Sequence, residues 1–171
     1  MNNEKLKIIP LGGLGEVGKN MMVYEYGDDI LIVDTGIMFP ENDMLGIDYI
    51  IPDFKYLLDE EKRRKVKGIV ITHGHEDHTG AITHVLEEIN APIYATPLTR
   101  GLIEVKLARK GIIKDTKIPT VNAGEKVDIG CFTVEFAHVN HSIPDGVALG
   151  IDTPEGLIVH TSDYKFDHTP V

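Results

Sequence analysis

The sequence predicts an α/β fold in which a mixed sheet is flanked by helices, and three observations carry this prediction. Short apolar, β-branched runs recur along the chain, helical patterns separate some of them, and a dense group of histidines and acids follows one run. The 171 residues are 42% hydrophobic and 26% charged, which is typical of one soluble globular domain. No apolar run approaches the roughly 20 residues of a membrane span, so we expect no membrane partner and a cytoplasmic location.

Eight apolar runs are predicted as strands, and turn residues separate several of them. Gly27-Asp28-Asp29 and Pro154-Glu155-Gly156 each lie between neighbouring runs, as hairpin turns do. Early hairpins followed by β-α-β order favour a mixed sheet with helices packed on it. The predicted strands span residues 6–11, 21–26, 30–34, 68–72, 92–96, 132–139, 147–152 and 157–163.

Three segments have helical patterns. Thr96 followed by Pro97 is typical of an N-cap and first helical position, and Gly111 is a typical C-terminal stop. A second segment repeats apolar residues at helical spacing, and a third carries charges expected to form a solvated face. The predicted helices span residues 97–110, 79–89 and 53–65.

The spacing Gly13-x-Gly15-x-x-Gly18 is that of a dinucleotide-binding turn, but its context differs. A Rossmann turn requires a helix directly after its glycines, and here residues 21–34 form two predicted strands with a turn between them. We therefore expect no dinucleotide cofactor. The glycines are expected to pack closely against a neighbouring part of the chain.

Cysteine content and charge restrict the possible function. Cys131 is the only cysteine, so no internal disulfide is possible, and we expect it to be a small buried strand residue. The formal charge of −10 argues against nucleic acid as a partner, although bound divalent cations would change the local charge.

The motif His73-x-His75-x-Asp77-His78 lies between a predicted strand and a predicted helix. Alternate residues of an extended chain project to one side, so His73 and His75 can reach one ion together. Asp77 and His78 are adjacent and diverge, so they are expected to serve a second ion. Imidazole and carboxylate ligands favour zinc, with manganese as an alternative where oxygen ligands dominate.

Further ligands are expected at other strand ends. His141 follows one predicted strand, and Asp163 ends another. Asp34, also at a strand end, is expected either to orient a ligand histidine through its other ring nitrogen or to be an ordinary turn residue.

The remaining histidines are weaker candidates. His138 and His160 lie inside predicted strands, where core or sheet-face roles are expected. His84 on a predicted helix and His168 in the final loop have no clear partner.

Together with Asp34, His141 and Asp163, the motif resembles that of the metallo-β-lactamase superfamily of binuclear hydrolases. Residues 10–21, 36–53, 141–145 and 161–167 are similar to the ribonuclease J family of its β-CASP nuclease branch. The resemblance implies an αββα sandwich. We expect residues 1–171 to be the amino-terminal part of the metallo-β-lactamase domain, without the β-CASP insert and the second half of the sandwich.

The resemblance also implies a role for each site residue. His73, His75 and His141 would hold one metal, Asp77 and His78 the other, and Asp163 would bridge them. Asp34 would orient a ligand, and Asp77 and His75 would act in catalysis. The implied cofactors are two divalent ions, with zinc expected and manganese or magnesium as alternatives. The glycine loop would then shape the rim of the metal site.

The implied activity is hydrolysis of RNA, as a 5′→3′ exonuclease with endonuclease activity, in RNA maturation and decay. Two ions suit this chemistry because they activate water and offset charge on phosphoryl oxygens. The implied partners are RNA and either further copies of the enzyme or related ribonucleases. The 171-residue chain alone is expected to be nearly inactive, because it lacks a last histidine and the domain that clamps RNA.

Two other classes of function remain open. One is a small-molecule hydrolase of the same superfamily that acts on a thioester or lactone, and the other is a metal-binding module without turnover. Separately, Asp48 with Glu41 and Asp43 could hold a structural calcium ion, or these acids could be ordinary polar loop residues.

Overall fold

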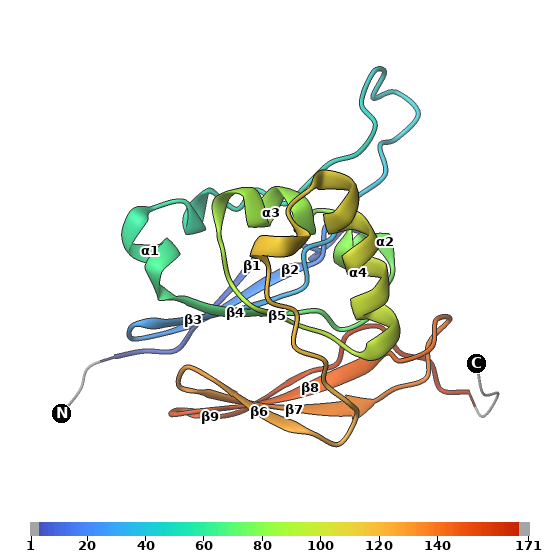
Figure 1. The fold of residues 1–171 in the computed structure, drawn as a ribbon. Coiled ribbons are helices and arrows are strands. Elements are labelled where there is room, and N and C mark those ends of the chain that lie inside the picture. The colour runs from blue at the N-terminus through green and yellow to red at the C-terminus, as the bar shows by residue number, and fades with distance from the viewer. Residues whose placement is uncertain (1–3, 168–171) are drawn as a thin grey trace.

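The computed structural model describes residues 4–167, which form a layer of helices on two stacked sheets (Figure 1). The first sheet has the order β1 (Lys7–Gly12), β2 (Met21–Tyr26), β3 (Asp29–Val33), β4 (Val66–Val70) and β5 (Ile93–Tyr94). The second has the order β6 (Lys126–Ile129), β7 (Phe132–His138), β8 (Val147–Thr153) and β9 (Gly156–His160). The helices are α1 (Glu60–Lys65), α2 (Glu76–Thr79), α3 (Ile82–Glu88) and α4 (Pro97–Lys110), with single 3₁₀ turns at Lys55–Leu57 and Ile113–Asp115.

The first sheet is mixed, as the sequence predicts. Its strands β1, β2 and β3 pair antiparallel, whereas β3, β4 and β5 pair parallel. Val33 pairs with Val70, so the carboxyl ends of β3 and β4 lie side by side at one edge of the sheet. The segments that follow these two strands therefore start from neighbouring positions, which places Asp34 beside Thr72.

Two apolar cores hold the layers together, because alternate residues of the first sheet face opposite sides. Ile30 and Ile32 of β3 face the helices, and Leu31 and Val33 face the second sheet. The helix-side core is completed by Ile69, Ile71, Ile82, Val85, Ile103 and Leu107. The inter-sheet core is completed by Val70, Phe132, Val134, Phe136, Leu149 and Ile151.

The α/β class and the helix-flanked mixed sheet are confirmed, but the strands divide between two sheets. The sequence missed β6, whose residues Lys126–Ile129 alternate polar and apolar over too short a run to be recognised. Cys131 lies between β6 and β7 and is half-buried, so its prediction as a buried strand residue was wrong. Its backbone N–H donates to Asp29 Oδ2 at 2.6 Å, which fixes the hairpin of β6 and β7 against the start of β3.

The helix predictions have mixed outcomes. Helix α4 spans Pro97–Lys110 as predicted, and Gly111 ends it in the left-handed region with φ of 78°. The predicted helix over 53–65 is interrupted at Asp59, whose extended backbone and carboxylate cap the first turn of α1. The predicted helix over 79–89 is replaced by α2, which begins three residues earlier, and the separate α3.

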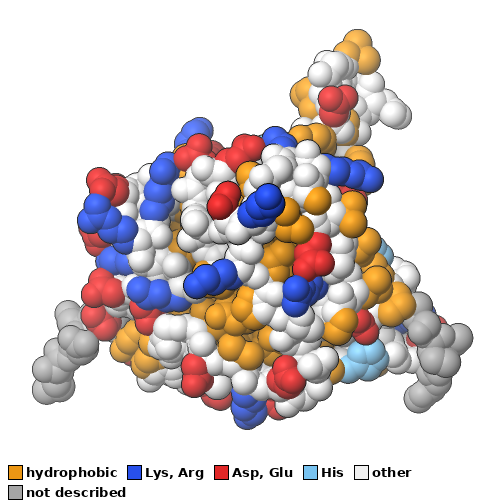
Figure 2. Space-filling model, viewed as in Figure 1, with side chains coloured by type: hydrophobic (Ala, Val, Ile, Leu, Met, Phe, Trp, Pro, Cys, Tyr) orange, Lys and Arg blue, Asp and Glu red, His pale blue; other side chains and the backbone are white. Residues whose placement is uncertain are grey.

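A loop over residues 38–50 projects from the helical layer (Figure 1). Met38 and Ile50 close its base through a pair of backbone hydrogen bonds. Its exposed side chains are both apolar and acidic, and Figure 2 shows them standing away from the body. Within residues 4–167, no helix has the length and apolar character needed to cross a bilayer.

Glu25 is a buried charge on the helix-facing side of β2. Its carboxylate accepts from Lys62 Nζ at 2.6 Å, Lys7 Nζ at 2.8 Å and the Tyr56 hydroxyl at 2.5 Å. Burial alone would raise its pKa, but these three donors outweigh burial and lower the pKa to about 2.

We expect Glu25→Gln to lower the free energy of unfolding in a pH-dependent way. A carboxyl whose pKa is lowered by folding stabilises the protein fully above its unfolded pKa, and this contribution disappears as pH falls through the folded pKa. The difference between wild type and variant should therefore shrink as pH decreases from about 4.5 towards about 2. Denaturant unfolding at a series of pH values measures it.

Glu60→Gln is the control, because this exposed residue pairs with Arg64 on the surface of α1. Its effect on the free energy of unfolding should be small at every pH. A Glu25→Gln effect that stays constant across this pH range would contradict the proposed origin of the stabilisation.

Candidate metal centre

The site is built at the edge where β3 and β4 end together. Asp34 follows β3 and donates its backbone N–H to Val70 O of β4 at 2.9 Å. The chain after β4 leads through Thr72 to the motif, in which His75 is the N-cap of α2 and Asp77 and His78 lie in its first turn. The sequence predicted the whole motif as a loop before a helix. In the structure its second half is helical, because α2 begins at Glu76.

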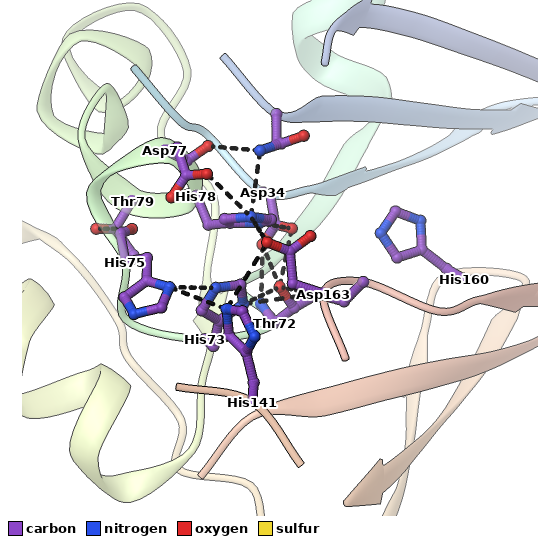
Figure 3. A network of polar contacts seen from close by, with 12 residues as sticks. Asp34, Thr72, His73, His75, Asp77, His78, Thr79, His141, His160 and Asp163 are labelled. Carbon is purple, nitrogen blue, oxygen red and sulfur yellow. Dashed lines mark hydrogen bonds and ion pairs between the residues drawn. The ribbon is translucent and has the colours of Figure 1, made fainter. Parts of the chain in front are cut away.

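Three histidines converge on one point, as Figure 3 shows. His75 Nδ1 lies 3.0 Å from His73 Nε2 and 3.1 Å from His141 Nε2. His141 comes from the loop after β7, so the two sheets contribute to the same cluster. All three ligand atoms lie within 4.8 Å of one another.

A second group consists of His73, His78 and Asp163. Asp163 Oδ2 lies 3.5 Å from His78 Nε2 and 3.7 Å from His141 Nε2, so this carboxylate stands between the two groups. Asp77 Oδ2 is 3.7 Å from His78 Nε2 and belongs to neither group of three.

The donor set fits a divalent transition metal. Zinc–nitrogen bonds of about 2.0–2.1 Å at tetrahedral angles separate ligand nitrogens by roughly 3.3 Å. The nitrogens of the histidine cluster are 3.0 and 3.1 Å apart, which is close to that separation. Each neutral imidazole ring has only one N–H, so several ring nitrogens that face one point cannot all be paired by hydrogen bonds to one another. Such a set of nitrogen atoms is suited to a metal ion.

His78 is held by Asp34, which is itself buried. Asp34 Oδ2 lies 2.8 Å from His78 Nδ1, so the opposite nitrogen, Nε2, faces Asp163. Burial alone would lower the pKa of His78, but the nearby carboxylates, Asp34 foremost, raise it to about 9. Burial would likewise raise the pKa of Asp34, yet His78 keeps it below its usual value. The orienting role of Asp34 stays a prediction, and this contact supports it.

The pKa of His73 is shifted in the opposite direction to that of His78. Burial, followed by the charge of His78, lowers its pKa to about 3. Burial also lowers the pKa of His141. His73 is therefore neutral at ordinary pH, and the neutral form is the one that binds a metal.

The glycine loop lies against the motif, as the sequence predicts. Asn20, just beyond Gly18, donates from Nδ2 to the backbone oxygen of Asp77 at 3.1 Å and lies 3.1 Å from His78 Nε2. Residues 15–18 and His75 line the same hollow together with Phe39. The loop thus forms part of the rim of the site.

Gly36 brings a third segment against the same backbone. Its N–H donates to Asn20 O at 2.9 Å, and the neighbouring Thr35 N–H donates to His78 O at 2.8 Å. A Cβ added at Gly36 would overlap the backbone carbonyl of Asp77. Glycine at this position therefore permits the loop after β3 to pack directly on the motif.

The other candidates lie outside the two groups. His160 is half-buried at the end of β9, where its Nδ1 lies 2.9 Å from the Tyr24 hydroxyl, and His138 is exposed. His84 has a partner that the sequence did not suggest, the Tyr49 hydroxyl at 2.9 Å. His168 lies outside the described residues. The calcium candidates Asp48, Glu41 and Asp43 are exposed on the projecting loop and join neither group of converging ligands.

Sequence reasoning missed three residues whose side chains contact the rings of candidate ligands: Asn20, Thr72 and Ser162. Each is a common polar residue with no spacing signal of its own. Asp145 is a further omission, because its carboxylate accepts from Leu98 N at the start of α4 and so anchors the loop that begins at His141. Thr96 is the N-cap residue of α4, as predicted, but its side chain makes no capping hydrogen bond, and the Asp145 carboxylate accepts from the start of the helix instead.

Comparison with known families and proteins agrees with this geometry. Residues 14–163 match the family model of the metallo-beta-lactamase superfamily. The chain is 47% identical to Ribonuclease J 1 of Streptococcus pyogenes serotype M3 and 46% identical to Ribonuclease J of Synechocystis. These alignments cover 100% and 98% of this chain but 31% and 26% of those proteins, so the chain spans less than a third of their length.

Solved structures show the same fold at low identity. A protein of unknown function from Enterococcus faecalis V583 has a TM-score of 0.71 at 21% identity, covering 94% of this chain and 44% of that one. The metallo-beta-lactamase fold protein YhfI from Bacillus subtilis has a TM-score of 0.69 at 20% identity, covering 95% of this chain and 64% of that one.

Proposed function

Because the chain belongs to the metallo-beta-lactamase superfamily, we propose that it carries the metal-binding part of an enzyme that hydrolyses RNA phosphodiester bonds. The proposed activity is 5′→3′ exonuclease with endonuclease action, in RNA maturation and decay. The observation that carries the proposal is the convergence of His73, His75, His141, His78 and Asp163 at one sheet edge. Similarity to proteins named ribonuclease J across nearly the whole chain supports the choice of RNA as substrate.

Superfamily membership implies divalent metal binding, and the proposed ligands are the members of the two groups together with Asp77. His73, His75 and His141 would hold one ion, His78 and Asp77 the other, and Asp163 would lie between them. Ions bound there would acidify a water molecule and offset charge on the phosphoryl oxygens. The number of nitrogen ligands supports zinc, with manganese or magnesium as alternatives.

The residues of the chain prepare this site in several ways. Burial keeps His73 neutral, and Asp34 fixes the ring of His78 so that its Nε2 faces the site. Asp77 remains partly exposed next to His78 and can accept a proton from the attacking water. We propose His75 and Asp77 as the residues whose loss affects the reaction most directly.

The chain's place in the whole protein is also a proposal. Its relatives are three to four times longer, which supports residues 1–171 as the amino-terminal part of a metallo-β-lactamase domain that a β-CASP insert and a second half complete. Most RNA contacts would then lie outside this acidic chain. We further propose that the enzyme acts in the cytoplasm as a homo-oligomer or with related ribonucleases.

The test uses the complete gene product that contains this chain. A labelled 5′-monophosphorylated RNA should be cleaved, cleavage should stop when a chelator removes the metal, and zinc or manganese should restore it. The same preparations are assayed with a thioester and a lactone. Hydrolysis of these compounds without RNA cleavage would favour the small-molecule alternative, and metal binding without any turnover would favour a non-catalytic module.

A further inference from the structure

Thr72 places a buried hydroxyl between Asp34 and His73, the histidine that both groups share. Its Oγ1 lies 2.9 Å and 3.1 Å from the two carboxylate oxygens of Asp34, 3.1 Å from His73 Nδ1 and 2.8 Å from Ser162 Oγ. The Thr72 side chain is fully buried, so no bulk water competes for these contacts. Figure 3 shows it among the ligands, with dashed contacts to its neighbours.

The number of hydrogens available decides the direction of each bond. A hydroxyl has one hydrogen to donate and two lone pairs that accept, whereas an ionised carboxylate only accepts. The Thr72 hydrogen is therefore directed to Asp34. Its lone pairs then accept from the Ser162 hydroxyl and from an N–H on His73 Nδ1.

This direction fixes the tautomer of His73. With hydrogen on Nδ1, the lone pair of the ring is on Nε2, which is the nitrogen that faces His75 at 3.0 Å. The same carboxylate holds His78 directly through Nδ1 at 2.8 Å. Asp34 thus reaches two histidines: His78 directly, and through one intervening hydroxyl His73, which belongs to both groups.

We propose that Thr72 is a positioning residue that relays the Asp34 carboxylate to His73, with Ser162 donating to Thr72 from the second sheet. The inference rests on the metal site of the proposed function. It goes beyond that function because it assigns the orientation of both His73 and His78 to one buried acid. Asp34 and Ser162 both have left-handed backbone, with φ of 63° and 52°, which non-glycine residues adopt mainly where the surrounding structure requires it.

The test compares Thr72→Val, which replaces the hydroxyl by a methyl group, with Thr72→Ser, which keeps the hydroxyl. Zinc affinity is measured by competition with a chelator, and the His73 tautomer by nitrogen–proton correlation spectra of isotope-labelled histidine. We expect Thr72→Val to bind zinc about 10- to 100-fold more weakly, as loss of a partner of a metal ligand does. Its His73 ring should populate both tautomers. Thr72→Ser should restore both measurements.

The matched control is Thr99→Val, which removes another fully buried threonine hydroxyl, one in α4 whose partner is the hydroxyl of the N-cap residue Thr96 and not a candidate ligand. It should leave zinc affinity and the His73 tautomer unchanged. If Thr72→Val does not fold, Ser162→Ala removes one donor to Thr72 from a less buried position and should still weaken zinc binding.

Wild-type zinc affinity in Thr72→Val, or failure of Thr72→Ser to restore it, would overturn the relay. These measurements do not require RNA cleavage. A protein that binds zinc with the expected variant pattern but leaves RNA intact would disprove the proposed ribonuclease and leave the relay standing.

Discussion

Replacing His75 by alanine should reduce RNA cleavage by the complete gene product by about a thousandfold or more, near the upper end of the cost of removing one charge-stabilising group. His75 Nδ1 lies 3.0 Å from His73 Nε2 and 3.1 Å from His141 Nε2, so it contacts both other members of the first group. Its loss would leave the first group with two protein ligands, which is fewer than a catalytic zinc normally retains.

The fold should survive this substitution. His75 begins α2 through its backbone oxygen, which accepts from the N–H groups of His78 and Thr79, and its side chain makes no capping bond. Alanine keeps that backbone oxygen. The measurements are the cleavage rate with saturating zinc or manganese, bound metal per chain, and the free energy of unfolding without metal.

His138→Ala is the matched control, because it removes an exposed histidine outside both ligand groups. It should leave the cleavage rate and the bound metal unchanged. A His75→Ala protein that cleaves RNA at the wild-type rate would remove this histidine from the metal site. Asp77→Ala should behave like His75→Ala, since its carboxylate is beside His78 at the same centre.

Gly36→Ala should have the largest effect on the structure. An added Cβ would overlap the Asp77 carbonyl and come within 2.9 Å of Asn20 N. Both neighbours are backbone atoms in a hydrogen-bonded stack, so neither can move without breaking bonds. We expect a loss of about 3 kcal/mol or more in the free energy of unfolding, at or above the upper end of ordinary overpacking. Metal binding should weaken as Asp77 and His78 move.

Gly101→Ala is the control for Gly36→Ala. Gly101 lies inside α4, and a Cβ there would meet nothing within 4 Å. Alanine should stabilise this helix by roughly 0.5–1 kcal/mol. Denaturant unfolding and zinc titration of both variants give the comparison. Near wild-type values for Gly36→Ala would show that the loop after β3 can retreat from the motif.

The sequence by itself determined the features that depend on neighbouring residues. Helix α4 could be predicted because Pro97 and Gly111 act within one turn of its ends. The proximity of His73 and His75 could be predicted because their spacing alone brings the two rings to one side. The hairpin turns at residues 27–29 and 154–156 are likewise local.

The tertiary structure alone decided which distant segments meet. Whether a run such as Lys126–Ile129 becomes an edge strand, and to which sheet it belongs, depends on pairing with β7 rather than on its own pattern. Thr72 contacts Asp34 across 38 positions and Ser162 across 90. No local periodicity encodes contacts of that range. They form because the parallel pairing of β3 with β4 and the packing of the second sheet bring the ends of these strands to one edge.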